Sequence, residues 1–391
     1  MPTMWSISDD TLAAWTRRSL ADVDDLLRST LHSPGDPFLT TVATHLLAAG
    51  GKRLRPALVL LAARFGDHDH PHVVRAAAAV ELMHVASLYH DDVMDEAPTR
   101  RGVPSVNARW SNRVAILAGD YLVARASELA APLGADAVEE QARMLTRLVT
   151  GQLRETVEAG RHPDPERYYM SVIADKTAAL FTLATRLGAR ASGAPAGTAT
   201  ALGAYGEALG IAFQLSDDLL DLAEPTARTG KPANADLREG VATLPVLRAI
   251  RPRIRGFGAD RTRGQDTDRT RGLDTDRPRG QDATQIRGLS VSRIRGWSAG
   301  RIRGRNRAGG GRDSARLRRM LAAGPITDAR ELATVARLVR RSPGFAQTRA
   351  EVERYACQAQ QALLALPAGP ARDALHALCD DVVSRAAPSS A

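Results

Sequence analysis

The sequence of 391 residues is poor in aromatic side chains, in cysteine and in long apolar runs, and each shortage excludes a class of protein. Only 4% of the residues are aromatic although 44% are hydrophobic, so the apolar content is mostly Ala, Leu and Val, which suits closely packed helices. The two cysteines, Cys357 and Cys379, exclude a disulfide framework and fit a reducing compartment. The sequence contains no run of about 18 apolar residues, so we expect no membrane-spanning helix. The first residues lack a signal-peptide pattern, so we expect a cytoplasmic protein.

The apolar–polar alternation that marks half-buried strands is also missing along the chain. Apolar residues recur at helical spacing instead, which predicts an all-α protein with roughly a dozen helices. The segments with this spacing are 8–31, 38–49, 57–65, 73–96, 111–131, 136–160, 166–190, 198–222, 314–341 and 346–387.

The net charge of +9 is concentrated in one segment. Residues 251–319 contain 20 Arg and 7 Asp, a net charge of +13, which leaves −4 for the remainder of the chain. A basic chain often binds nucleic acid. Because the excess of positive charge here belongs to a single segment, it does not identify the whole protein as a nucleic-acid-binding one.

That basic segment is a repeat. The pair Arg-Gly recurs seven times with a period of eight residues, from Arg255 to Arg303. Its mixture of Gly, Arg, Asp and Thr cannot bury a core. We therefore divide the chain into a helical domain over 1–250, a poorly ordered insertion over 251–312, and the C-terminal helices of the same domain over 313–391. The insertion is either a tolerated repeat expansion in a surface loop, which we favour, or a tract that binds RNA or a membrane surface.

Two acidic motifs of the form D-D-x-x-D carry the clearest chemistry. The first is Asp91, Asp92 and Asp95, and the second is Asp217, Asp218 and Asp221; each ends an apolar helical run. Residues four apart share a helix face, and like charges crowded there require a counter-ion. Hard cations with oxygen ligands, above all Mg²⁺, suit such a site. Two facing motifs could hold several Mg²⁺ ions with a polyanion between them.

Basic and polar residues at other places complete a possible anion site. Gly50-Gly51-Lys52-Arg53-Leu54-Arg55-Pro56 combines an open backbone with three cations, and Arg100-Arg101-Gly102 follows the first acidic motif. The pair Lys176-Thr177 lies inside an apolar helix, where it is costly unless it has a partner such as phosphate. Taken alone, the first of these motifs could be a solvated basic turn and the second a charge-balancing loop. His84 lies two turns before Asp91 and is either a core residue or a ligand.

In their order along the chain these motifs resemble those of the trans-isoprenyl diphosphate synthases, or polyprenyl synthetases. The resemblance covers roughly 40–250 and 314–387, and it includes Phe213-Gln214 before the second acidic motif and Gly230-Lys231-Pro232 after it. It implies a bundle of antiparallel helices around a deep central cavity, usually in a homodimer. It also implies a reaction that joins an allylic diphosphate, farnesyl or geranylgeranyl, to isopentenyl diphosphate.

The resemblance assigns roles residue by residue. It implies that the six Asp residues of the two motifs hold three Mg²⁺ ions on the allylic diphosphate, and that Thr177 lies beside the reacting carbons. Residues implied to contact the allylic diphosphate are Arg100, Lys176, Gln214 and Lys231, and those implied to hold the diphosphate of isopentenyl diphosphate are Lys52, Arg55, His84 and Arg101. In the implied reaction an allylic cation forms as the diphosphate leaves, the double bond of isopentenyl diphosphate attacks it, and a proton is lost.

Three features depart from the family pattern. Asn234 stands where the family has Gly, and Val241 stands where it has Lys, which removes one cation. The repeat insertion has no counterpart. None of these departures touches an acidic motif, so we expect activity.

The length of the product depends on the residues before the first motif. Ala86 and Ser87 are small and lie about one turn from the metal ligands, which favours a deep tunnel and a long product. Met83 and Tyr89 could narrow the tunnel. The surrounding sequence resembles heptaprenyl to decaprenyl synthases, which make quinone side chains.

Four other functions would account for parts of this sequence. A geranylgeranyl diphosphate synthase is the main alternative. A terpene cyclase needs only one substrate site, which disagrees with the intact Lys52, Arg55, His84 and Arg101 set. A non-catalytic subunit would be expected to lack Asp residues, and both motifs are complete. RNA binding through the Arg-Gly tract would be lost on deletion of 251–312, whereas prenyl transfer would survive.

Overall fold

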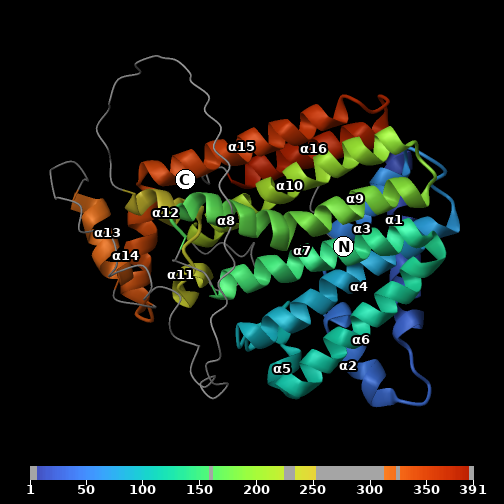
Figure 1. Ribbon diagram of the computed structural model, residues 1–391, viewed down its shortest axis with the longest axis horizontal. Coiled ribbons are helices and arrows are strands. Elements are labelled where there is room, and N and C mark those ends of the chain that lie inside the picture. The colour runs from blue at the N-terminus through green and yellow to red at the C-terminus, as the bar shows by residue number, and fades with distance from the viewer. Residues whose placement is uncertain (1–6, 158–161, 224–233, 252–311, 323–325, 387–391) are drawn as a thin grey trace, which may run out of the picture.

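The computed structural model describes residues 7–157, 162–223, 234–251, 312–322 and 326–386. Within these ranges the protein is a bundle of helices, and its strands are two residues long (Figure 1). The predicted all-α fold is therefore confirmed. Among the described helices, none is both long and apolar enough to cross a bilayer.

The described elements are mostly helical. Two of them are single irregular turns, a 3₁₀ turn η1 (Ala131–Leu133) and a π turn η2 (Ala174–Ala178). The strands β1 (Thr99–Arg100) and β2 (Val103–Pro104) form a small antiparallel hairpin. The α-helices are α1 (Asp10–Leu31), α2 (Pro37–Ala48), α3 (Leu54–Ala63), α4 (Pro71–Met94), α5 (Val106–Arg109), α6 (Asn112–Ala130), α7 (Ala135–Val157), α8 (Pro165–Ile173), α9 (Ala179–Ala191), α10 (Ala196–Leu222), α11 (Ala235–Glu239), α12 (Leu244–Ile250), α13 (Arg312–Ala322), α14 (Ala329–Arg340), α15 (Pro343–Leu363) and α16 (Pro370–Arg385).

The centre of the bundle consists of α3, α4, α9 and α10. Residues 56–63 of α3 are all buried, as expected for a helix that is apolar on every side. Small residues bring the helix backbones close together. At Gly188 of α9, a Cβ atom would lie 2.2 Å from the carbonyl oxygen of Val59 in α3, so only glycine fits this contact. The Ala-rich, aromatic-poor composition thus produces tightly spaced helices.

A second, smaller apolar cluster joins α12, α13 and α14 at one end of the molecule (Figure 1). The chain leaves this cluster after α12 and returns to it at α13. There the hydroxyl of Ser314 donates to the carbonyl oxygen of Ala249 at 2.9 Å. Residues 252–311, which include nearly all of the predicted insertion, lie outside the described residues. The insertion therefore begins and ends at neighbouring points.

The helix boundaries differ from the predicted segments in three places. The predicted helix 166–190 is interrupted by the π turn η2. The predicted helices 314–341 and 346–387 are each two helices, and the second break lies between Leu363 and Pro370, where Pro367 and Gly369 interrupt the helical pattern. The hairpin at 99–104 was not predicted, because two-residue strands are too short to show alternation.

Candidate active site

The first acidic motif lies at the C-terminal end of α4, on the wall of a cavity of about 620 Å³. Asp91 and Asp95 line this cavity. Asp92 points the other way and is fully buried, and its Oδ1 accepts from Nε and Nη2 of Arg100 at 2.7 and 2.5 Å. The β1–β2 hairpin places Arg100 there. Arg100 neutralises Asp92 directly, as the alternative of a charge-balancing loop would have it, and its predicted contact with a substrate diphosphate stays a prediction.

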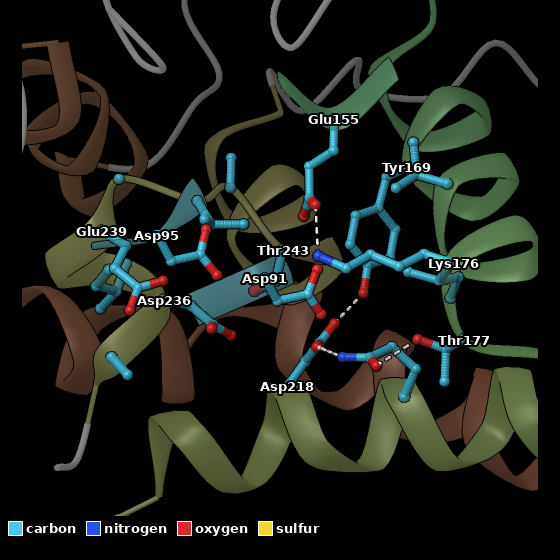
Figure 2. A pocket seen from close by; sticks show the side chains of 18 of the residues that line it. Asp91, Asp95, Glu155, Tyr169, Lys176, Thr177, Asp218, Asp236, Glu239 and Thr243 are labelled. Atoms are coloured by element: carbon cyan, nitrogen blue, oxygen red, sulfur yellow. Dashed lines mark hydrogen bonds and ion pairs between the residues drawn. The ribbon is translucent and has the colours of Figure 1, made fainter. Parts of the chain in front are cut away.

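The second acidic motif lies near the C-terminal end of α10, and its three carboxylates have different partners. Asp218 points into the cavity and is almost fully buried; it accepts from the hydroxyl of Tyr169 and from Nε2 of Gln214, the latter at 3.0 Å (Figure 2). Asp217 accepts from Nη2 of Arg385 at 2.7 Å. Asp221 accepts from the backbone N–H groups of the first turn of α11, and so fixes that helix beside the cavity.

Lys176 and Thr177 project into the cavity from the π turn η2. Nζ of Lys176 donates to Glu155 of α7 at 2.6 Å, and the hydroxyl of Thr177 donates to Oε1 of Gln214 at 2.8 Å (Figure 2). Single π turns widen a helix and are frequent at functional sites. The extra residue in this turn directs both polar side chains toward the two acidic motifs.

The π turn is held against α7 from behind. Asp175 accepts from Arg147 at 3.1 Å and from Arg154 at 2.8 Å, and both arginines belong to α7. Gly151 of α7 allows this close approach, because a Cβ there would lie 3.0 Å from the backbone nitrogen of Lys176. The position of Lys176 therefore depends on how closely α7 packs.

The cavity has an excess of negative charge around Asp91 and Asp218. Burial, joined by repulsion from Asp95 and Glu155, raises the pKa of Asp91 to about 6, although Lys176 opposes the change. Burial also raises the pKa of Asp218 to about 7, against its hydrogen bonds from Tyr169 and Gln214. Burial lowers the pKa of Lys176, but the carboxylates of Glu155 and Asp91 more than offset it, so that pKa is raised overall. Such carboxylates favour a bound cation.

A basic pocket adjoins the acidic motifs. Arg55 and His84 line the cavity, and Nη1 of Arg55 lies 3.2 Å from Nε2 of His84. Burial and the nearby arginines lower the pKa of His84 well below its usual value, so the imidazole is neutral and its Nε2 accepts from Arg55. The guanidinium of Arg55 lies over the ring of Phe181 at 5.1 Å, and its buried Nε has no protein acceptor among the described residues. Lys52 is largely exposed, yet the partial burial of its side chain and the charge of Arg385 lower its pKa.

Some predicted site residues are not brought to the cavity. Tyr89 points toward α2, where its hydroxyl donates to the carbonyl oxygen of Val42 at 2.7 Å. Met83 and Ala86 are buried in the core, and of the four predicted wall residues only Ser87 lines the cavity. Arg101 donates to the carbonyl oxygens of Leu46 in α2 and of Gly50 in the loop before α3, and Lys231 lies outside the described residues.

Three residues of the site were missed by sequence reasoning. Arg385 contacts Asp217 from a helix 168 residues further along the chain, which no local pattern reveals. Tyr169 and Glu155 contact Asp218 and Lys176, and their only sequence signal is a polar residue within an apolar helix. The two single-residue departures from the family pattern lie within the described residues. Asn234 has a positive φ of 60°, a conformation that favours glycine and that Asn tolerates, and Val241 lines the cavity without a charge.

The described carboxylates can hold metal ions only together with another ligand. No three Asp, Glu, His or Cys side chains in the described parts of the chain converge on one point. The reason is that Asp92 is paired with an arginine, Asp217 likewise, and Asp221 caps α11. Mg²⁺ is commonly bound by one or two carboxylates together with substrate phosphates. The carboxylates facing the cavity fit that mode of binding.

Together the helical bundle and its cavity define the all-α isoprenoid synthase fold. A family model described as polyprenyl synthetase matches residues 36–266, and the chain belongs to this family. The predicted family is thereby confirmed.

Three relatives illustrate its range. A nonaprenyl diphosphate synthase of Mycobacterium tuberculosis is 38% identical over 380 residues, which cover 97% of this chain and 96% of the relative. A heptaprenyl diphosphate synthase component 2 of Geobacillus stearothermophilus is 42% identical over 251 residues, 64% of this chain and 76% of the relative. The crystal structure of a geranylgeranyl pyrophosphate synthase of Corynebacterium glutamicum, complexed with calcium and isoprenyl diphosphate, has 37% identity and a TM-score of 0.73, covering 97% of this chain and 99% of that one.

Proposed function

We propose that the protein is a Mg²⁺-dependent prenyltransferase that extends an allylic diphosphate, farnesyl or geranylgeranyl, with successive isopentenyl diphosphates to a long all-trans polyprenyl diphosphate for a quinone side chain. One observation carries the proposal: carboxylates of both acidic motifs and the Arg55–His84 pocket line the same cavity. An anionic ligand held through metal ions and a second anion held by guanidinium groups would therefore lie side by side.

The chemistry follows from the charges of the site. Three Mg²⁺ ions held by Asp91, Asp95 and Asp218, with the other motif carboxylates, would neutralise the allylic diphosphate as a leaving group. Lys176 and Arg100 line the same cavity and would add positive charge near that diphosphate. Below them Leu88, Leu148 and Leu180 line the cavity and exclude water from the allylic cation.

The second diphosphate belongs in the basic pocket. The unpartnered Nε of Arg55 is a buried donor that an incoming phosphate oxygen would satisfy. His84 stays neutral and keeps Arg55 directed toward the cavity. Lys52 contributes from the exposed rim. This arrangement fits a condensation of two diphosphate substrates. A cyclase needs only one substrate site and would not require the basic pocket.

The predicted long product rests on Ser87 and on the relatives. Ser87 is a small residue on the cavity wall, and the nonaprenyl and heptaprenyl synthase relatives have names that specify long products. A geranylgeranyl product is the second candidate, because the geranylgeranyl pyrophosphate synthase covers nearly the whole chain.

We also expect the protein to form a homodimer. Ile116 and Leu117 of α6 and Val149 and Leu153 of α7 are large apolar side chains with 44%, 68%, 46% and 60% of their surface exposed. Exposed apolar residues on neighbouring helices are typical of protein contacts. The name of the heptaprenyl synthase component 2 keeps a different partner chain as the alternative.

The deciding experiment is incubation of the purified protein with farnesyl diphosphate, isopentenyl diphosphate and Mg²⁺, with the product identified by mass spectrometry. Heptaprenyl to decaprenyl diphosphates are expected. A product that stops at geranylgeranyl diphosphate would support the second candidate. No elongation at any primer would contradict the proposal for the isolated chain, and sedimentation of the same sample would show whether a homodimer had formed.

A further inference from the structure

Glu81 is a buried carboxylate beside the site that the proposed chemistry does not use. It lies on α4, ten residues before Asp91, and is only 2% exposed. Its Oε1 accepts from Nη1 of Arg53 at 2.9 Å and lies 3.7 Å from Nη2 of Arg101. A buried carboxylate between two guanidinium groups is costly to desolvate, so its presence calls for an explanation.

Both arginines that contact Glu81 support the loop that carries Lys52. Arg101 donates through Nη1 to the carbonyl oxygen of Gly50 at 2.6 Å and to that of Leu46 at 2.8 Å. Arg53 belongs to the loop itself, has a positive φ of 49°, and donates through Nε to Asp24 of α1 at 2.8 Å. The loop is therefore fixed by side chains rather than by regular structure.

Gly51 shows how closely the loop rests on these groups. A Cβ atom at Gly51 would lie 3.1 Å from the guanidinium carbon of Arg101 and 3.1 Å from Nη1 of Arg53. The two guanidinium groups thus lie directly under the backbone that precedes Lys52. A shift of either group would move the loop.

The charges around the loop also require Glu81. Arg53, Arg55 and Arg101 are three cations in one partly buried region. Burial is the main cause that lowers the pKa of Arg55, to about 10, and also lowers that of Arg101, and in both cases Glu81 is the strongest group opposing the change. The carboxylate therefore offsets the mutual repulsion of the arginines while no phosphate is bound.

We propose that Glu81 is a positioning residue for the isopentenyl diphosphate site: it holds Arg53 and Arg101 beneath the Gly50–Arg53 loop, so that Lys52 and Arg55 meet the diphosphate in one fixed geometry. Glu81 itself does not touch the substrate. The inference rests on the proposed function, because that function places isopentenyl diphosphate in the basic pocket.

The test is Glu81→Gln, which keeps the shape of the side chain and removes its charge. The KM for isopentenyl diphosphate should rise roughly tenfold to a hundredfold, the effect expected for a small misplacement of binding groups. The KM for farnesyl diphosphate should stay within about twofold, because the acidic motifs are untouched. Glu81→Asp, which keeps the charge but shortens the reach, should give an intermediate KM and provides a second variant if Glu81→Gln folds poorly.

The matched control is Glu140→Gln. Glu140 lies on α7, is 9% exposed, and pairs with Arg186 at 2.6 Å and Arg190 at 3.1 Å, so it is likewise a buried carboxylate between two arginines, outside the cavity. It should lower the melting temperature without changing either KM. A role of Glu81 in folding alone would give the same pattern in Glu81→Gln and would overturn the proposal.

A second measurement does not depend on turnover. Binding of inorganic pyrophosphate to the full-length protein in the absence of divalent metal reports on the basic pocket, and calorimetry should show weaker binding to Glu81→Gln than to the wild type. Unchanged or tighter binding, as expected if the lost negative charge only made the pocket more positive, would overturn the proposal. If the wild type bound pyrophosphate but made no polyprenyl product, the proposed function would fail while the role of Glu81 could still be judged.

Discussion

At the scale of single residues, ionisation of the carboxylates that face the cavity costs free energy of folding. The pKa of Asp91 is raised to about 6 and that of Asp218 to about 7, from a usual value of 3.8. A raised pKa of an acid means that the native state binds a proton more tightly than the unfolded state does. These two groups therefore stabilise the metal-free protein as the pH falls from 8 toward 5, and weaken it as the pH rises through 6 and 7.

Binding of Mg²⁺ should offset this loss of stability where the carboxylates are ionised. We expect the rise in melting temperature caused by Mg²⁺ to be larger at pH 8 than at pH 6, because at the lower pH the metal must displace protons. Thermal unfolding with and without Mg²⁺ at both pH values measures the difference, and other titrating groups largely cancel from it. In Asp218→Asn the dependence on pH should flatten. A larger metal effect at pH 6 would show that these carboxylates are not the ligands.

Ser87 is the residue at which product length can be tested directly. It lines the cavity four residues before Asp91, about 6 Å along the helix. Ser87→Phe should fill the space below the allylic diphosphate and shift the product to shorter chains, while the rate of the first condensation stays within about threefold. Mass spectrometry of the products measures this, and Ser87→Ala is the control. An unchanged product distribution would place the growing chain elsewhere.

The residue scale also shows what sequence reasoning could reach. The acidic motifs and the Lys176-Thr177 pair could be predicted because each is local in sequence and its charges are out of place in an apolar helix, and Arg100 because it follows the first motif closely. Arg385 was missed, because it joins Asp217 only through the fold. Tyr89 was expected to narrow the cavity, but it lies two residues before Asp91 and therefore about 200° round α4 from it, so its hydroxyl reaches α2 instead.

At the scale of elements, the π turn is the feature that positions Lys176, and its fit against α7 can be perturbed. Gly151→Ala would place a methyl group 3.0 Å from the backbone nitrogen of Lys176, closer than unstrained contact. Overpacking of this kind costs about 1–3 kcal/mol of unfolding free energy. We expect kcat to fall about tenfold or more as Lys176 is displaced.

The control for Gly151→Ala is Gly197→Ala in the first turn of α10. A Cβ there has nothing within 4 Å, so alanine should leave kcat unchanged and stabilise the helix by up to about 1 kcal/mol. Steady-state kinetics and thermal unfolding of both variants provide the comparison. Equal kcat values for the two variants would mean that η2 does not depend on its contact with α7.

The π turn also explains why the element scale was predicted only in outline. Helical spacing over 166–190 predicted one helix, because a single extra residue shifts the phase of the apolar pattern once and keeps the helical spacing on either side of the turn. The only sign in the sequence was chemical, since Lys176 and Thr177 fell on an apolar run. The sequence therefore predicts that a helix is present over 166–190, but it does not predict the π turn that positions Lys176 and Thr177.

At the scale of the whole molecule, the repeat insertion can be tested for a role in catalysis. Because Ser314 and Ala249 are hydrogen-bonded, a short Gly-Ser linker should replace residues 252–311 without separating α12 from α13. We expect this deletion variant to retain prenyl transfer within about threefold and to lose any affinity of the full chain for RNA or anionic vesicles. Product analysis and binding assays on both proteins decide the matter. Loss of turnover in a folded deletion variant would assign the segment a part in the reaction.

The adjacent ends of the insertion have a consequence for how the gene can change. Closing a loop between neighbouring points costs free energy that grows only with the logarithm of the loop length, so one more octapeptide added to about 60 residues costs about 0.1 kcal/mol. A change in stability this small would hardly be subject to natural selection. The number of repeats is then free to drift between related strains, much as a tandem array drifts in non-coding DNA, while the enzyme on either side of it stays the same.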